Sequence, residues 1–153
     1  MSRVLTVQHV LKIENWRFNY SFGIGKTRFC PELYSDHRFL VLQVSIVAPK
    51  SIKATRGKVT CLAFDELIEG YKQPAAATAQ TRPVGEVGYR GSDYGATLTL
   101  PSDALPLILQ MLIAGKYQFI EFDAEKGGGD ISSFGFRDYV GDEPALAAGW
   151  DDA

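Results

Sequence analysis

Apolar and polar residues alternate along the first part of the chain, with the two-residue period of a half-buried strand. From residue 3 to residue 13 the apolar face carries odd-numbered residues, namely Leu5, Val7, His9, Leu11 and Ile13. From residue 16 the apolar positions become even-numbered: Trp16, Phe18, Tyr20 and Phe22. A shift of one residue turns every side chain of a strand to the other face. The pattern therefore predicts a bulge or tight turn near residues 14–15.

Further strands are predicted by apolar, β-branched runs and by the turn residues that bound them. Residues 38–48 have the composition of a central strand, which Pro49 should end because proline cannot donate to the ladder. The stretch that follows is typical of a hairpin turning around Arg56 and Gly57. Residues 73–84 are predicted to form an exposed connection. A glycine-rich hairpin over 85–95 should lead into a strand at 96–100, and two last strands, at 117–124 and 130–140, are joined by the glycine-rich residues 125–129.

One helix is predicted at residues 102–115, just before the last hairpin. Ser102 or Asp103 is expected to cap it, Pro106 falls in or just after its first turn, and Gly115 suits the left-handed residue after its last turn. Gln110 is the one polar residue from 104 to 114, so this helix is apolar all round and must be covered on both sides.

Many strands and a single inserted helix indicate a mainly β fold. We expect an antiparallel β-sandwich, with a partly closed β-barrel as the alternative. Strands and helices do not alternate regularly, which disfavours a parallel nucleotide-binding sheet. Residues 1–140 are expected to form one domain, and residues 141–153 an acidic, loosely held tail.

Composition places the chain among ordinary globular proteins. It has 153 residues, of which 46% are hydrophobic and 22% charged, enough to form a single core. The first residues do not have the pattern of a signal peptide, and the longest apolar run is too short to cross a bilayer, so we expect a soluble cytoplasmic protein without a membrane role. Cys30 and Cys61 are the two cysteines and form no CxxC pair, so a disulfide framework is not indicated.

Charge is distributed unevenly along the chain. Residues 1–60 contain ten Lys or Arg against three Asp or Glu, a net charge of +7, and the rest contains six against fifteen, a net charge of −9. Residues of the basic part include Lys50, Lys53, Arg56 and Lys58, but no aromatic residues stand beside them to stack on bases. Nucleic acid is therefore an unlikely partner.

No coherent catalytic or metal-binding set emerges from the motifs. Residues 25–27 read Gly-Lys-Thr like the end of a phosphate-binding loop, but Tyr20 stands where that motif requires glycine and no helix is predicted to follow. Cys30 and His37 match no nucleophile signature. His9, Cys30, His37 and Cys61 have none of the close spacing of structural zinc sites. We expect no catalytic residue, no metal and no cofactor.

Recognition residues are better represented. Tyr89, Arg90 and Tyr94 lie in a glycine-rich loop and are of the types enriched in contact surfaces. The leading hypothesis is a small non-enzymatic module that binds a protein partner or forms a homodimer, with Leu107 and Met111 of the apolar helix at the oligomer interface. A second hypothesis is a small-ligand or carbohydrate-binding domain in which Trp16 joins the two tyrosines.

A third hypothesis concerns acid-base chemistry. Glu121 and Asp123 are predicted on one face of a strand, as a pair able to transfer protons in a hydrolase or isomerase, with His9 as a third group. This function requires a concave pocket in which the three side chains converge.

Overall fold

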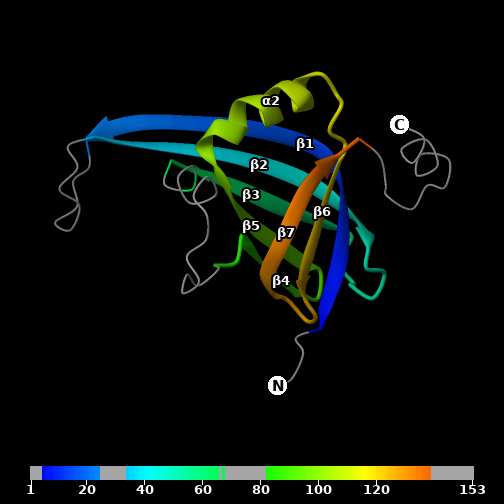
Figure 1. Cartoon of the computed structure of the whole chain (residues 1–153). Helices are drawn as coiled ribbons and strands as arrows, with labels where there is room; N and C mark the ends of the chain where they lie inside the picture. Colours follow the sequence, from blue (N-terminus) through cyan, green and yellow to red (C-terminus); the bar gives the residue numbers. More distant parts are fainter. Residues whose placement is uncertain (1–4, 25–33, 66, 68–81, 139–153) are drawn as a thin grey trace, which may run out of the picture.

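In the computed structural model the described part of the chain folds into a closed β-barrel with the α-helix α2 at one end (Figure 1). The structure describes residues 5–24, 34–65, 67 and 82–138. The strands of these residues follow the order β1-β2-β3-β5-β4-β7-β6 around the barrel. Their bounds are β1 Thr6–Ile24, β2 Tyr34–Ala48, β3 Arg56–Phe64, β4 Gly85–Arg90, β5 Asp93–Pro101, β6 Phe119–Glu125 and β7 Gly129–Arg137.

The expected sandwich is wrong, and the barrel alternative describes the sheet. β1 pairs with β2 on one side and with β6 on the other, which joins the two ends of the sheet. Neighbouring strands are antiparallel except β3 and β5, which run parallel because the chain crosses over between them. The apolar alternation in the strands fits either architecture, and only the pairing of β1 with β6 distinguishes them.

The barrel interior is filled by alternate side chains of its strands. Fully buried residues include Leu40 and Leu42 on β2, Leu98 on β5, Ile120 on β6 and Ile131 on β7. Residues between them face outwards and are mostly exposed or half-buried, as the pleat requires. The predicted change of apolar parity in β1 is confirmed: its pairing with β2 shifts register between Ile13 and Asn15.

The helix closes one end of the barrel. A 3₁₀ turn, η1 (Ser102–Ala104), leads into α2 (Leu105–Ile113), which packs Leu105, Ile108 and Leu112 against the core (Figure 1). Gly115 follows with φ +69°, in the left-handed conformation expected after the last turn. The expected capping is wrong, because the α-helix begins after Ala104 and no side chain caps either helical start.

The turns of the barrel agree with the sequence in part. Gly127, Gly128 and Gly129 all have positive φ in the connection from β6 to β7, as a tight glycine turn requires. β2 ends at Ala48, just before Pro49, as predicted. The turn predicted at Arg56 and Gly57 is misplaced, since both residues already pair with β2, opposite Ser45 and Val44.

Several sequence predictions fall outside the described residues. They include Cys30, most of the connection predicted at 73–84, and the acidic tail at 141–153. In the described part of the chain, no helix has the length and apolar character needed to cross a membrane.

Candidate functional site

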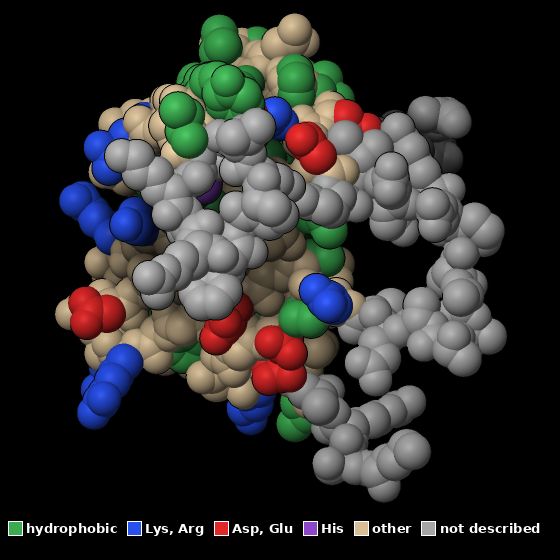
Figure 2. Space-filling model, turned by 90° about the vertical axis from the view of Figure 1, so that its left-hand side faces the viewer, with side chains coloured by type: hydrophobic (Ala, Val, Ile, Leu, Met, Phe, Trp, Pro, Cys, Tyr) green, Lys and Arg blue, Asp and Glu red, His purple; other side chains and the backbone are tan. Residues whose placement is uncertain are grey.

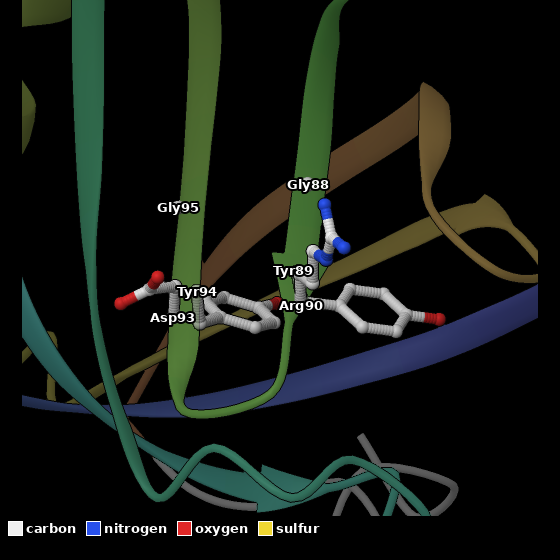
Figure 3. Close-up of a pocket in the computed structure, with 6 residues that line it drawn as sticks. All are labelled: Gly88, Tyr89, Arg90, Asp93, Tyr94 and Gly95. Carbon is white, nitrogen blue, oxygen red and sulfur yellow. The ribbon is translucent and has the colours of Figure 1, made fainter.

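Two of the predicted contact residues, Tyr89 and Tyr94, come together on the β4–β5 hairpin (Figure 3). They are paired across the hairpin, with ring centroids 6.0 Å apart and planes 14° from parallel. Tyr94 is only 7% exposed and belongs to the core, so most of its ring is unavailable for stacking on a ligand outside the barrel. Arg90 is exposed and pairs across the hairpin with Asp93, on the other face from the two tyrosines.

Tyr94 reaches a histidine inside the barrel. The Tyr94 hydroxyl oxygen lies 2.8 Å from Nδ1 of His9, whose side chain is fully buried. The imidazole stacks on Phe122, with ring centroids 4.8 Å apart, and its Nε2 has no hydrogen-bond partner among the described residues. Burial lowers the pKa of His9 and raises the pKa of Tyr94, so both groups are held in their neutral forms.

The hairpin also borders an open depression. It has a volume of about 420 Å³ and is lined by Tyr89, Arg90, Tyr94, Asp93 and two glycines. Trp16 lines a different, smaller depression of about 100 Å³ together with Asn15, Arg17, Val41 and Gln43. Three of the four predicted contact residues thus border one depression, with Arg90 on the other face of the hairpin from the two tyrosines, and Trp16 lies elsewhere.

The predicted acid-base set is divided between two faces of the sheet. His9 pairs with Phe122 and therefore shares its inward face. Glu121 and Asp123 alternate with Phe122 along β6 and point to the outer face. Glu121 lies 3.9 Å from Arg137, and Asp123 accepts a hydrogen bond from Ser133. The three groups do not converge on one pocket, contrary to what the hydrolase hypothesis requires.

The most unusual feature is a two-stranded extension of the barrel, which we call the arm: residues 19–24 of β1 and 34–38 of β2. β6 pairs with β1 only from Thr6 to Lys12, and β3 pairs with β2 only from Phe39 onwards. Beyond these points the two strands pair only with each other among the described residues, ending at Ile24 opposite Tyr34. Figure 1 shows the arm (blue and cyan) running out past the rest of the sheet.

One face of the arm is apolar and exposed. Trp16 and Phe18 of β1 pack against the edge of the core. The next even-numbered residues on the same face are Tyr20, Phe22 and Ile24, whose side chains are 58%, 65% and 67% exposed. Tyr34, 61% exposed, stacks on Phe22 with ring centroids 5.6 Å apart. Sequence reasoning identified this row but not its exposure. The length of the row could have indicated its exposure, since an apolar row of this extent cannot all fit inside a barrel whose other strands are short.

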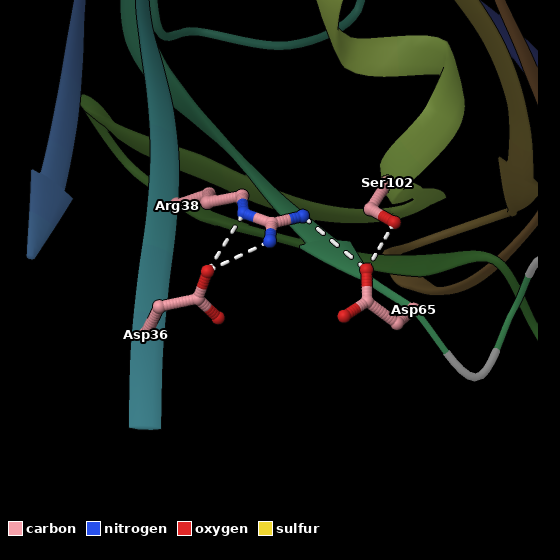
Figure 4. Close-up of polar contacts among 4 residues, drawn as sticks. All are labelled: Asp36, Arg38, Asp65 and Ser102. Atoms are coloured by element: carbon pink, nitrogen blue, oxygen red, sulfur yellow. Dashed lines mark hydrogen bonds and ion pairs between the residues drawn. The ribbon is translucent and has the colours of Figure 1, made fainter. Parts of the chain in front are cut away.

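A polar network holds the root of the arm to the start of the helix (Figure 4). Arg38, opposite Tyr20, donates through Nη2 to Asp36 at 2.7 Å and through Nη1 to Asp65 at 3.3 Å. Ser102 donates its hydroxyl to the same Asp65 oxygen. The Ser102 hydrogen bond, together with Arg38, lowers the pKa of Asp65. The network links β2, the end of β3 and η1 at the root of the arm.

The outer side of α2 is a second apolar surface. Leu107 and Ile113 are 59% and 73% exposed, while Met111 is half-buried. Figure 2 shows hydrophobic side chains gathered at the top of the molecule, the end at which α2 and the arm lie in Figure 1. The predicted interface residues Leu107 and Met111 are therefore on an accessible or partly accessible surface, but nothing in the fold favours one occupant of it.

Comparison of the chain with protein-family models, with curated proteins and with solved structures found no significant match. Its function must therefore be inferred from its own residues and geometry.

Proposed function

We propose that this chain is a non-enzymatic protein-binding module whose contact surface is the apolar face of the arm. The observation that carries the proposal is the exposure of Tyr20, Phe22, Ile24 and Tyr34 side by side on a two-stranded element. The largest contiguous apolar patch on a monomeric protein is often an interaction site. Tyrosine and phenylalanine are also the residue types that supply most contact energy in interfaces.

The surroundings of this patch support a specific contact. Arg38 and Asp36 lie on the same face of β2, opposite Tyr20 and Phe22. Their ion pair places charged groups beside the apolar rings, which resembles the polar rim that surrounds the apolar centre of an interface. The rings of Phe22 and Tyr34 stack on each other, so they present one continuous apolar surface to a partner.

A photo-crosslinking amino acid in place of Phe22 tests this function in the organism that makes the protein. We expect irradiation to give a discrete covalent product from position 22. The matched control is the same substitution at Glu86, an exposed residue of β4 outside the arm, from which no such product is expected. Equal labelling from both positions, or none from position 22, would contradict the proposal.

Loss of the patch should abolish the contact without unfolding the chain. In a variant with Tyr20→Ser and Phe22→Ser, the crosslinker moves to Ile24, and its product should disappear. Both replaced side chains are largely exposed, so the free energy of unfolding should change little, which far-UV circular dichroism in urea would check.

A further inference from the structure

The arm has an unpaired backbone edge as well as an apolar face. Along residues 15–24 the side of β1 turned away from β2 has no strand partner among the described residues. Such an edge presents alternating N–H and C=O groups that can pair with another strand. Natural edges are protected by proline, by charged side chains or by bulges. Residues 15–24 contain no proline and one charged side chain, Arg17, and the bulge of β1 lies only at their start.

From this edge we propose that the arm is a homodimer interface in which β1 pairs antiparallel with β1 of a second copy, around a two-fold axis at Tyr20. The proposal rests on the protein-binding function above and names its partner. When the two-fold axis lies between the two copies of one residue, the residues that become paired across the strands lie on the same face of the sheet. The apolar row of one copy then extends the apolar row of the other.

The side chains of the edge suit this register. With the axis at Tyr20, Phe18 stands opposite Phe22 of the second copy, and Trp16 opposite its Ile24. Aromatic pairs and aromatic–aliphatic pairs across strands are stabilising. On the other face, Asn19 meets Ser21 and Arg17 meets Gly23, so no like charges oppose each other. The strand is thus complementary to itself on both faces.

The area available also fits a dimer of modest size. An aromatic side chain buries roughly 150–250 Å² when fully covered. Tyr20, Phe22 and Ile24 lie on the pairing strand and are each more than half exposed, and pairing covers the flanks of their side chains, whereas Tyr34 lies on β2, one strand away from the new contact. With the backbone edge and the half-buried rings of Trp16 and Phe18 they offer on the order of 400 Å² per copy, about half of the roughly 800 Å² per partner that a stable interface needs, which is the size of a weak contact. We expect a dimer that dissociates on dilution.

Sedimentation velocity over a series of protein concentrations tests the dimer directly. The wild-type chain should change from monomer to dimer as its concentration rises. The variant with Asn19→Lys and Ser21→Lys places lysine opposite lysine twice in the proposed register, and it should dimerise about tenfold more weakly. Both positions are exposed, so the fold should be retained, as circular dichroism would show.

Charge complementation then tests the register. The variant with Asn19→Glu and Ser21→Glu should also be largely monomeric alone, but a mixture of the lysine and glutamate variants should form the heterodimer, because each lysine then faces a glutamate. A mixture that stays monomeric would overturn the edge pairing. Dimers that survive in the lysine variant but are lost on Leu107→Asp would overturn it as well, and would place the interface on α2.

Failure of this inference is distinguishable from failure of the proposed function. If the wild-type chain is monomeric at high concentration while a crosslinker at position 22 captures a different protein, the arm binds a partner that is not a second copy. If the crosslinker captures nothing and the chain is monomeric, both proposals are wrong.

Discussion

Replacing Tyr94 by phenylalanine should destabilise the barrel through His9 rather than through lost packing. The substitution removes one hydroxyl and keeps the ring. That hydroxyl is the partner of Nδ1 in a fully buried imidazole whose Nε2 already has none among the described residues. After the substitution, both ring nitrogens of His9 are buried without a hydrogen bond.

The magnitude follows from that loss. A buried polar group left unsatisfied costs about 1–3 kcal/mol, whereas replacing both partners of a buried hydrogen bond by apolar groups of similar shape is nearly neutral. We therefore expect Tyr94→Phe to lower the free energy of unfolding by about 2 kcal/mol in the chain that has His9. In a chain with His9→Leu, the same change should cost less than about 0.5 kcal/mol, because no imidazole remains to be satisfied.

Urea denaturation followed by far-UV circular dichroism measures the four chains of this cycle. With a slope of about 1–3 kcal/mol per M, a loss of 2 kcal/mol moves the midpoint by roughly 1 M. All four chains must be measured at one protein concentration, since a dimer would make the midpoint concentration-dependent. Equal costs of Tyr94→Phe with His9 and with Leu at position 9, agreeing within about 0.5 kcal/mol, would refute the reasoning, because independent sites add.

Three other outcomes are expected. Burial lowers the pKa of His9 in the folded chain below its ordinary 6.5, so the unfolded chain binds the proton first as the pH falls. The contribution of His9 to stability should therefore be complete above pH 6.5 and should be lost as the pH decreases below it. Urea titrations at several pH values should show this slope in the wild type and a flatter one in His9→Leu. Burial raises the pKa of the Cys61 thiol to about 12, so in a chain with Cys30→Ser a thiol reagent at pH 8 should label the protein only after unfolding. Gly85→Ala would press its new methyl group into the β5 backbone and should cost about 1–3 kcal/mol, whereas Gly88→Ala on the same strand meets nothing within 4 Å and should cost much less by the same urea assay.

Local patterns in the sequence predicted the elements well where one physical cause acts alone. The parity change in β1 predicted a bulge or tight turn, which is a bulge, and the three glycines at 127–129 predicted a hairpin connection, in which all three have positive φ. Ser102 was misread because a serine before a helix is usually its cap, whereas here Asp65, 37 residues earlier, accepts its hydroxyl. Arg56 and Gly57 were misread because glycine favours turns. Gly57 is in fact needed in the strand, since a Cβ there would come within 2.6 Å of the Tyr94 ring.

Long-range pairing decided the rest. The closure of β1 onto β6 is not visible in a linear pattern, because it depends on which strands become neighbours. The division of His9 from Glu121, by contrast, follows from the alternation along each strand. The candidate site was missed for the same reason as the closure. Tyr20 and Phe22 continue the apolar parity of Trp16 and Phe18, and periodicity alone cannot distinguish a residue that enters the core from one that extends beyond it.

The arm follows from a mismatch of strand lengths. β1 has 19 residues and β2 has 15, whereas the strands that flank them, β6 and β3, have 7 and 9. A barrel has no sheet edges only where each strand is paired on both sides. The residues of β1 and β2 that extend beyond β6 and β3 therefore leave the barrel, and their apolar face is not covered by other strands of the described residues. Because Trp16 and Phe18 belong both to the edge of the core and to the base of the apolar row, a partner that covers the arm would also bury the core edge more deeply. Binding should therefore stabilise the whole barrel, and the stability of the fold and the occupancy of the arm should be linked.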